Sequence, residues 1–160
     1  MTKRANALPF SARYSSSEVP ETMRKAVSLV AGQDLEPRPI GPITQTDIVR
    51  FAGAGGDFNP LHHDAEYAVR AGLPGVISMG QMQAGMLAAW VADLVHVEHL
   101  LEFSVRFASP LQIGETLTLT GTVEEVETTG EAAVAELSLH ASVGDRAVVT
   151  ARARARVAAS

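Results

Sequence analysis

"MGQMQAGMLAAWVADLV", residues 79–95, is the stretch that decides the fold, because apolar and small residues fill nearly all of its positions. A helix that is apolar on most of its sides is a buried helix, since other parts of the protein must cover every face. Its length of about 16 residues suits a core helix and falls short of the roughly 18 apolar residues that a membrane span needs. The sequence therefore predicts one long central helix.

Four segments rich in Val, Leu and Thr follow this helix. Several of them alternate apolar and polar residues, which is the period of a β-strand with one buried face. The segments are "LLEFSVRFASP" (100–110), "ETLTLTGTVEEVE" (115–127), "AAVAELSLHASV" (132–143) and "RAVVTARARARVA" (146–158). Short links that contain glycine join them, so we expect an antiparallel meander. Together with the buried helix this predicts an α+β fold in which an antiparallel sheet wraps a central helix.

The chain before the central helix reads as short elements and turns. "EPRPIGPI" (36–43) carries three prolines, which predicts an extended edge segment or a loop. "TQTDIVRFAGAGG" (44–56) predicts a helix capped by Thr44 or Thr46 and ended by glycines, and "DAEYAVRAG" (64–72) a short helix capped by Asp64. We expect residues 1–22 to be a flexible N-terminal extension and residues 23–160 to form one domain.

Composition excludes several classes of function. The 160 residues are 46% hydrophobic, which suits a single globular domain. The formal net charge of −5 argues against non-specific nucleic-acid binding, which depends on Lys and Arg. Cysteine is absent from the sequence, so disulfides, thiolate ligands and a thiol nucleophile are excluded. The N-terminus starts basic but has no apolar core of a signal peptide, and we expect a cytoplasmic protein without a membrane anchor.

The stretch "GGDFNPLHHDAEYA" (55–68) brings together five polar side chains that could take part in chemistry: Asp57, Asn59, His62, His63 and Asp64. Zinc sites favour histidines four residues apart on a helix, so the adjacent His62 and His63 do not indicate a metal. Asp57 and His62 can instead face one small volume across a turn stiffened by Pro60, where an imidazole can exchange a proton at neutral pH. Asp-x-Asn-Pro is equally good turn chemistry without catalysis, and from the residues alone the frequency of such turns favours that interpretation.

The longer run "FAGAGGDFNPLHHDAEYA" resembles the signature of the MaoC-like (R)-specific enoyl-thioester hydratases and dehydratases. The positions that carry the resemblance are Phe51, Gly56, Asp57, Asn59, Pro60, Leu61, His62 and Ala68. Similarity extends over roughly residues 28–158. The resemblance implies a hot-dog fold and a hydro-lyase that hydrates trans-2-enoyl thioesters to (R)-3-hydroxyacyl thioesters, or dehydrates them in reverse. It implies pairing into a homodimer or a higher hot-dog oligomer, with a heterodimer also open.

The same resemblance assigns roles to residues. Asp57 and His62 become the catalytic pair that activates water, with Asn59 in support. The backbone N–H of Gly80 becomes the donor to the thioester carbonyl oxygen. Met79 and Gln81 stand where the family has the His and Met of a His-Gly-Met motif, and together with Met82 they are expected to border the substrate tunnel. The implied substrate is an acyl thioester of coenzyme A or of an acyl carrier protein, so coenzyme A or phosphopantetheine enters as part of the substrate. Neither a metal nor a further cofactor is expected.

Other interpretations stay open beside this one. The chain can be a non-catalytic or half-site hot-dog subunit of a heteromeric dehydratase, or an acyl thioesterase, although the latter lacks the Asp-x-Asn-Pro-x-His run. Met82, Met86 and Trp90 can line an acyl tunnel, but core packing is the simpler expectation. Arginines at 152, 154 and 156 share one strand face, which predicts a solvated surface or else a contact to phosphates or an acidic carrier.

Overall fold

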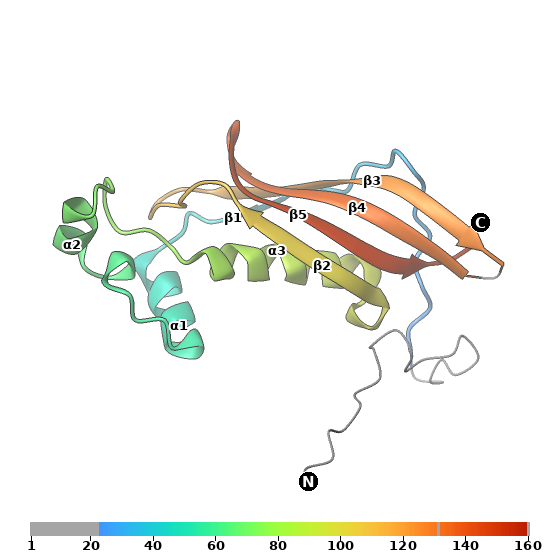
Figure 1. Cartoon of the computed structure of the whole chain (residues 1–160), viewed down its shortest axis with the longest axis horizontal. Helices are drawn as coiled ribbons and strands as arrows, with labels where there is room; N and C mark the ends of the chain where they lie inside the picture. The colour runs from blue at the N-terminus through green and yellow to red at the C-terminus, as the bar shows by residue number, and fades with distance from the viewer. Residues whose placement is uncertain (1–22, 131, 160) are drawn as a thin grey trace, which may run out of the picture.

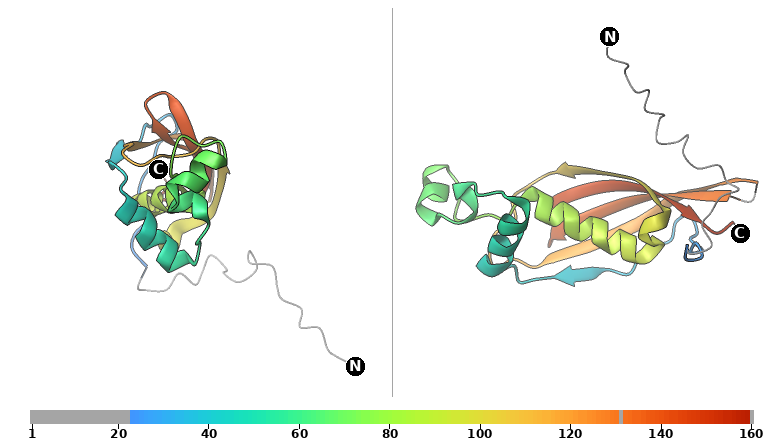
Figure 2. Two further views of the ribbon diagram at one scale, coloured as in Figure 1. Left: turned by 90° about the vertical axis from the view of Figure 1, so that its left-hand side faces the viewer. Right: turned by 90° about the horizontal axis from the view of Figure 1, so that it is seen from below.

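A curved antiparallel sheet lies over one long helix, α3 (Gly80–Val95), in the computed structural model, which describes residues 23–130 and 132–159 (Figure 1). The sheet has five strands in the order β1-β3-β4-β5-β2. Their bounds are β1 Arg38–Ile40, β2 Leu100–Phe107, β3 Leu117–Thr129, β4 Ala132–Val143 and β5 Arg146–Val157. Seen from below, α3 crosses the concave face of the sheet (Figure 2).

The core forms between this helix and the sheet. Leu87 and Val91 of α3 are fully buried, because they point at the sheet. Strand alternation supplies the opposite wall, where Leu119, Leu137 and Leu139 are almost completely buried. The predicted α+β fold, with an antiparallel sheet wrapped around a central helix in the hot-dog arrangement, is confirmed.

The expected meander is correct for β3, β4 and β5 and wrong for β2. Strand β2 pairs with β5, in a register that places Phe103 opposite Ala153, and it forms one edge of the sheet. Strand β3 lies near the other edge, where it pairs with the edge strand β1. The segment between β2 and β3 therefore crosses from one edge of the sheet towards the other. Alternation shows which residues face the core, but it does not show which strand is the neighbour.

Arg146 holds this crossing segment in place. Its Nη1 donates to the carbonyl oxygen of Pro110 at 2.6 Å, and its Nη2 donates to Glu115 Oε1 at 2.6 Å. A guanidinium provides several donors in a rigid fork, so one side chain can fasten two points of a loop. The loop therefore has a defined path although it carries no regular structure.

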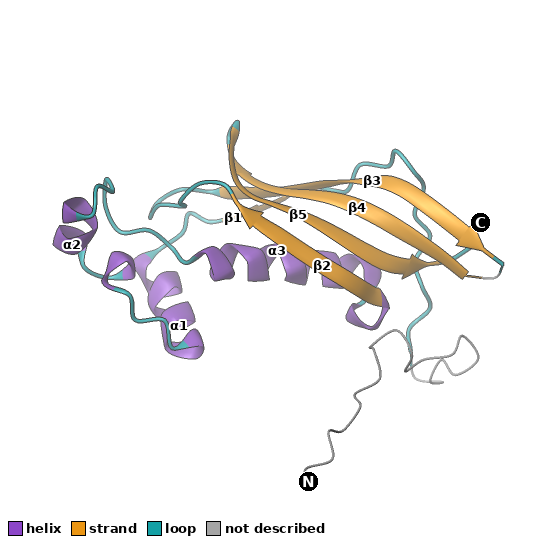
Figure 3. Cartoon of the chain, in the orientation of Figure 1, coloured by secondary structure: helices purple, strands orange, loops and turns teal. Residues whose placement is uncertain are grey.

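Helix α1 (Gln45–Gly55) lies on the same side of the sheet as α3, and α2 (Ala65–Arg70) lies beyond the end of the sheet, past the start of α3 (Figure 3). Helix α1 starts at Thr44, which forms a reciprocal capping box with Asp47, and α2 starts at the predicted cap Asp64. Two short 3₁₀ helices, η2 (Pro60–His62) and η3 (Val97–His99), complete the description. The predicted edge segment with its prolines contains β1, which is an edge strand.

The predicted N-terminal extension, residues 1–22, lies outside the described residues. Within the part of the chain that the structure describes, no helix is long and apolar enough to cross a membrane.

Candidate active site

Asp57 lies directly after the C-terminal end of α1. Gly56 takes a left-handed conformation with φ of 69°, which only glycine adopts without strain, and it stops the helix. The Asp57 N–H donates to the carbonyl oxygen of Ala52 at 3.2 Å, so the aspartate sits directly beyond the last helical turn. Its side chain is 41% exposed, which leaves the carboxylate open to water and to a ligand.

His62 is the last residue of the next turn, the 3₁₀ helix η2. Asn59 Oδ1 accepts the N–H of Leu61 at 3.1 Å, and Pro60 occupies the first position of the 3₁₀ turn, where its fixed φ is tolerated. The Asn59 N–H donates to Asp57 Oδ1 at 3.3 Å. Asn59 therefore supports both partners: its side chain shapes the turn that carries His62, and its backbone orients Asp57.

The turn brings the two predicted catalytic groups together. His62 Nε2 lies 3.6 Å from Asp57 Oδ2, and the His62 side chain is only 10% exposed. His62 Nδ1 lies 2.8 Å from the carbonyl oxygen of Ile77. A carbonyl oxygen only accepts, so Nδ1 must carry the proton in that bond. A neutral His62 consequently presents an unprotonated Nε2 towards Asp57.

The start of α3 lies a few residues beyond this contact. Ile77 contacts the turn through both of its backbone polar groups. Its carbonyl oxygen faces His62 Nδ1, and its N–H donates to the carbonyl oxygen of Leu61 at 3.2 Å. Three residues later Gly80 opens α3, and in the described structure the cap residue Met79 offers no side-chain acceptor to the first N–H groups. Such N–H groups at a helix start are available for an anionic oxygen.

Gly80 also allows a close side-chain approach. A Cβ at this position would lie 2.9 Å from two ring carbons of Phe107, at the end of β2. A glycine is therefore required for the observed position of the aromatic ring.

The three predicted tunnel residues lie in different environments. Met79 is buried in the core with 1% exposure, and Gln81 is exposed on the surface of α3. Met82 is buried but also lines a groove between α1 and α3 with a volume of about 820 Å³. Of the three, Met82 is the one that lines this groove.

The other histidines lie apart from the pair. His63 is exposed, and its Nε2 lies 3.3 Å from the carbonyl oxygen of Phe58. The side chain of His99 is buried near the end of α3, where its Nε2 lies 2.7 Å from the carbonyl oxygen of Arg24. Among the described residues, no group of three or more His, Cys, Asp or Glu side chains is arranged to hold a metal ion.

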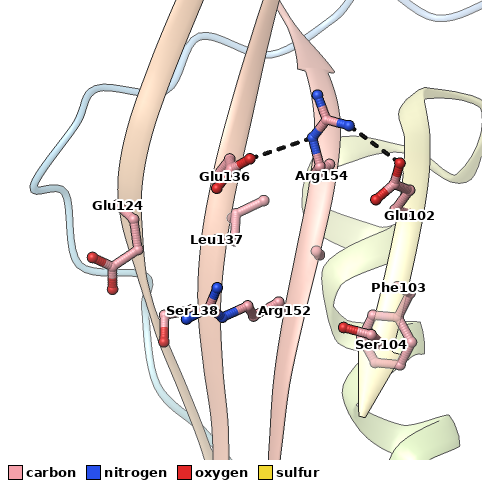
Figure 4. Close-up of a pocket in the computed structure, with 10 residues that line it drawn as sticks. Glu102, Phe103, Ser104, Glu124, Glu136, Leu137, Ser138, Arg152 and Arg154 are labelled. Carbon is pink, nitrogen blue, oxygen red and sulfur yellow. Dashed lines mark hydrogen bonds and ion pairs between the residues drawn. The ribbon is translucent and has the colours of Figure 1, made fainter.

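Three alternating arginines of β5, Arg152, Arg154 and Arg156, lie on the face of the sheet opposite its buried Ala and Val residues. Arg154 bridges two carboxylates, with Nη1 at 3.1 Å from Glu102 and Nε at 3.4 Å from Glu136 (Figure 4). Arg152 lies one row along, in register with Ser104 and Ser138 on the neighbouring strands. Exposed ion pairs of this kind contribute little stability, and this surface agrees with the solvated sheet face predicted from the sequence.

Comparison with known proteins identifies the family. The sequence profile of the MaoC-like domain matches residues 27–144. The chain belongs to this family. The match includes the turn that carries Asp57 and His62, the central helix and every strand except β5.

Curated relatives of this MaoC-like chain carry the names of hydro-lyases, the enzyme class predicted from the sequence. It is 30% identical to the 3-hydroxybutyryl-CoA dehydratase of Methylorubrum extorquens over 72% of its own length and 73% of the relative. It is 32% identical to the (R)-specific enoyl-CoA hydratase of Rhodospirillum rubrum over 51% of its own length and 58% of the relative. The chain thus spans less than two thirds of the latter protein.

The fold of the MaoC-like chain is shared with solved structures. The ChsH1-ChsH2 complex from Mycobacterium tuberculosis is similar at a TM-score of 0.71 and 22% identity, over 82% of this chain and all of the matched one. At this identity the similarity shows the fold alone.

Two positions near the site were not predicted from the sequence. Gln45 donates from Nε2 to the carbonyl oxygen of His62 at 3.0 Å and so connects α1 to the turn that carries His62. Gln83, at 2% exposure, donates from its amide to Ser78 Oγ beneath the start of α3. A polar residue within a mostly apolar helix is a signal that could have indicated Gln83, but Gln81 and Asp93 of the same helix share it and are not buried.

Proposed function

We propose that the chain is an (R)-specific enoyl-thioester hydratase or dehydratase in which Asp57 and His62 activate water. The observation that carries this proposal is the separation of 3.6 Å between His62 Nε2 and Asp57 Oδ2. Because His62 Nδ1 faces the carbonyl oxygen of Ile77, the Nε2 of a neutral imidazole is left as the acceptor on the side of the carboxylate. A direct hydrogen bond is shorter than this, whereas two acceptors at such a separation can share one water molecule. The pair is therefore suited to holding a nucleophilic water.

In the hydration direction, the oxygen of this water forms a bond to C3 of a trans-2-enoyl thioester. The water gives up one proton to the Asp57–His62 pair, and the electrons of the carbon–carbon double bond move towards C2 and the thioester carbonyl. The pair then delivers a proton to C2, so that water is added across the bond without an external acid or base. Dehydration of an (R)-3-hydroxyacyl thioester follows the same steps in reverse.

Negative charge develops on the thioester oxygen in the transition state, and Gly80 is proposed to bind that oxygen. A backbone N–H at a helix start is a pre-oriented donor, and donors aimed at developing charge make large contributions to catalysis. The chemistry as proposed needs no metal and no redox cofactor, because coenzyme A or the phosphopantetheine of a carrier protein is part of the substrate. A cytoplasmic location is part of the same proposal.

We further propose that two hot-dog domains pair through β2, as a homodimer of this chain. β2 is an edge strand of the described sheet, and its apolar residues Val105 and Phe107 are 37% and 51% exposed. An edge strand with exposed apolar side chains is suited to pairing with a second sheet. A half-site subunit of a heteromer would differ in a measurable way, since it would remain a monomer or turn over no substrate when purified alone.

The experiment is hydration of crotonyl-coenzyme A by the purified chain, with chiral analysis of the product and light scattering for the oligomeric state. Asp57→Asn and His62→Ala are expected to abolish turnover while circular dichroism and thermal unfolding stay close to wild type. His63→Ala is the matched control, because His63 is the exposed neighbour of the pair. Retained turnover in both Asp57→Asn and His62→Ala would refute the assignment.

A further inference from the structure

The segment between α2 and α3 reaches the proposed catalytic pair through Ile77. His62 Nδ1 lies 2.8 Å from the carbonyl oxygen of Ile77, and the Ile77 N–H donates to the carbonyl oxygen of Leu61 at 3.2 Å. Ile77 and Ser78 also precede Gly80, the proposed donor to the thioester oxygen. The position of this short segment therefore affects both the imidazole and the start of α3.

The same segment is held from its other side by the crossing segment between β2 and β3, residues 108–116. Ile77 forms an isolated antiparallel bridge with Gln112, and the Ser78 N–H donates to the carbonyl oxygen of Leu111 at 2.8 Å. Leu111 is completely buried, so this contact lies inside the protein rather than in solvent. The orientation of Ile77 thus depends on where these two residues of the crossing segment lie.

One ion pair, between Arg146 and Glu115, brackets Leu111 and Gln112. Arg146 Nη1 donates to the carbonyl oxygen of Pro110 at 2.6 Å, and its Nη2 donates to Glu115 Oε1 at 2.6 Å. The second oxygen of the carboxylate, Oε2, accepts from the Gln112 N–H at 2.8 Å. The pair therefore fixes the backbone immediately before Leu111 and at Gln112 itself.

The Arg146–Glu115 pair is partly shielded from water, with side chains that are 38% and 25% exposed. Burial alone would raise the pKa of Glu115, but hydrogen bonds from the Gln112 N–H and from Arg146 outweigh burial and lower it from its usual value of 4.5. Glu115 is therefore ionised at neutral pH. Arg146 Nη1 also donates to Ser109 Oγ at 2.8 Å, so the planar guanidinium serves three acceptors in a geometry that a lysine ammonium does not reproduce.

A second ion pair of the same kind lies at the opposite end of α3. Arg24 Nε lies 2.9 Å from Glu98 Oε1, and the two side chains are 57% and 23% exposed. Glu98 belongs to η3, which follows the C-terminal end of α3, whereas the Arg146–Glu115 pair borders the segment before its N-terminal end. Partly exposed ion pairs contribute little stability, so the two pairs should differ in their effect on the site rather than on folding.

We propose that Arg146 and Glu115 are positioning residues for the hydration reaction, because they hold the backbone that aligns Ile77 with His62. The inference rests on the proposed function, which takes His62 to be part of the base that activates water. The effect passes through backbone contacts, so neither residue needs to touch the substrate. A displacement of about 1 Å in a reacting group can lower turnover on the order of a hundredfold. Loss of the ion pair should therefore lower kcat while KM stays nearly unchanged.

The first test measures the tautomer of His62 without a substrate. In protein labelled with a nitrogen isotope, nuclear magnetic resonance distinguishes a proton on Nδ1 from one on Nε2, and His62→Ala identifies the His62 signals. At a pH at which histidine is neutral, wild type should carry the His62 proton on Nδ1. Arg146→Gln and Glu115→Gln should instead show a mixture of the two tautomers. Arg24→Ala is the matched control and should resemble wild type.

The second test measures turnover of crotonyl-coenzyme A by the same variants. Arg146→Gln and Glu115→Gln should each lower kcat on the order of ten- to a hundredfold with KM nearly unchanged, and Arg24→Ala should leave both constants as they are. Arg146→Lys keeps the charge without the fork, so it should recover little of kcat, and it replaces Arg146→Gln if that variant does not fold. Circular dichroism and thermal unfolding establish that each variant is folded.

Two outcomes would overturn the inference: a His62 proton that stays on Nδ1 in the folded Arg146 and Glu115 variants, or an equal loss of kcat in Arg24→Ala. A wild type without turnover would refute the proposed hydration alone, and the tautomer measurement would still decide whether the pair positions His62. If wild type is active and kcat is unchanged in the folded Arg146 and Glu115 variants, the hydration stands and the positioning role is wrong.

Discussion

Replacing Gln83 by leucine tests whether a buried polar pair organises the start of α3. Gln83 and Ser78 are 2% and 3% exposed, and the Gln83 amide donates to the Ser78 hydroxyl oxygen. Leucine is close to glutamine in size but has no polar atoms, so Gln83→Leu leaves the Ser78 hydroxyl buried without this partner. Leaving a buried polar group unpaired costs about 1–3 kcal/mol, and we expect the free energy of unfolding to fall by that amount.

A double-mutant cycle separates the hydrogen bond from packing. Ser78→Ala leaves the Gln83 amide unpaired and should also be destabilising, whereas Ser78→Ala combined with Gln83→Leu removes both polar groups at once. The double variant should therefore be more stable than the sum of the two single losses by about 1–2 kcal/mol. Urea unfolding followed by circular dichroism gives all four values. Losses that simply add would refute the reasoning.

The same cycle tests the connection to catalysis. Ser78 follows Ile77, whose carbonyl oxygen accepts from His62 Nδ1, and it precedes Gly80 by two residues. If the pair positions this segment, each single variant should lower kcat for crotonyl-coenzyme A with little change in KM. A loss of stability with kcat unchanged would mean that the pair contributes to folding alone.

Three further predictions concern the scaffold. A Cβ at Gly121 would lie 2.7 Å from Leu139 Cδ2 and 3.1 Å from a backbone oxygen of β4, so Gly121→Ala should cost about 1–3 kcal/mol in urea unfolding, while Gly53→Ala, which has open space, should not. Thr44→Ala removes the cap of α1 and should cost about 1 kcal/mol in the same assay. Hydrogen bonding to the Arg24 guanidinium lowers the pKa of Glu98 from 4.5 to about 2. Its stabilising contribution is therefore present above pH 4.5 and is lost as the pH falls towards 2, and Glu98→Gln should flatten the acid limb of a stability–pH curve.

Local rules made most of the fold predictable. The uniform apolarity of residues 79–95 predicted α3, and period-two alternation predicted the four long strands, because burial of one face imposes both patterns. The cap at Asp64, and a cap at Thr44 or Thr46, were predictable because a side-chain oxygen at a helix start satisfies free N–H groups, and the structure shows that Thr44 is the cap of α1. The strand neighbours were not predictable in this way. Pairing of β2 with β5 depends on which edge is free after β1 has occupied the other, and that is a property of the whole sheet.

The candidate site likewise has one part that local sequence rules predict and one part that depends on the rest of the fold. Asp57, Asn59 and His62 lie within six residues, so turn chemistry alone brings them close. The orientation of His62 has a different origin, because its Nδ1 proton is held by a backbone carbonyl oxygen fifteen residues away, at Ile77. Every residue type carries such an oxygen, so no side-chain pattern in the sequence can identify the residue that provides it. The spacing of the motif thus predicts which groups meet, whereas the state in which His62 meets Asp57 depends on how the segment before α3 packs against the turn.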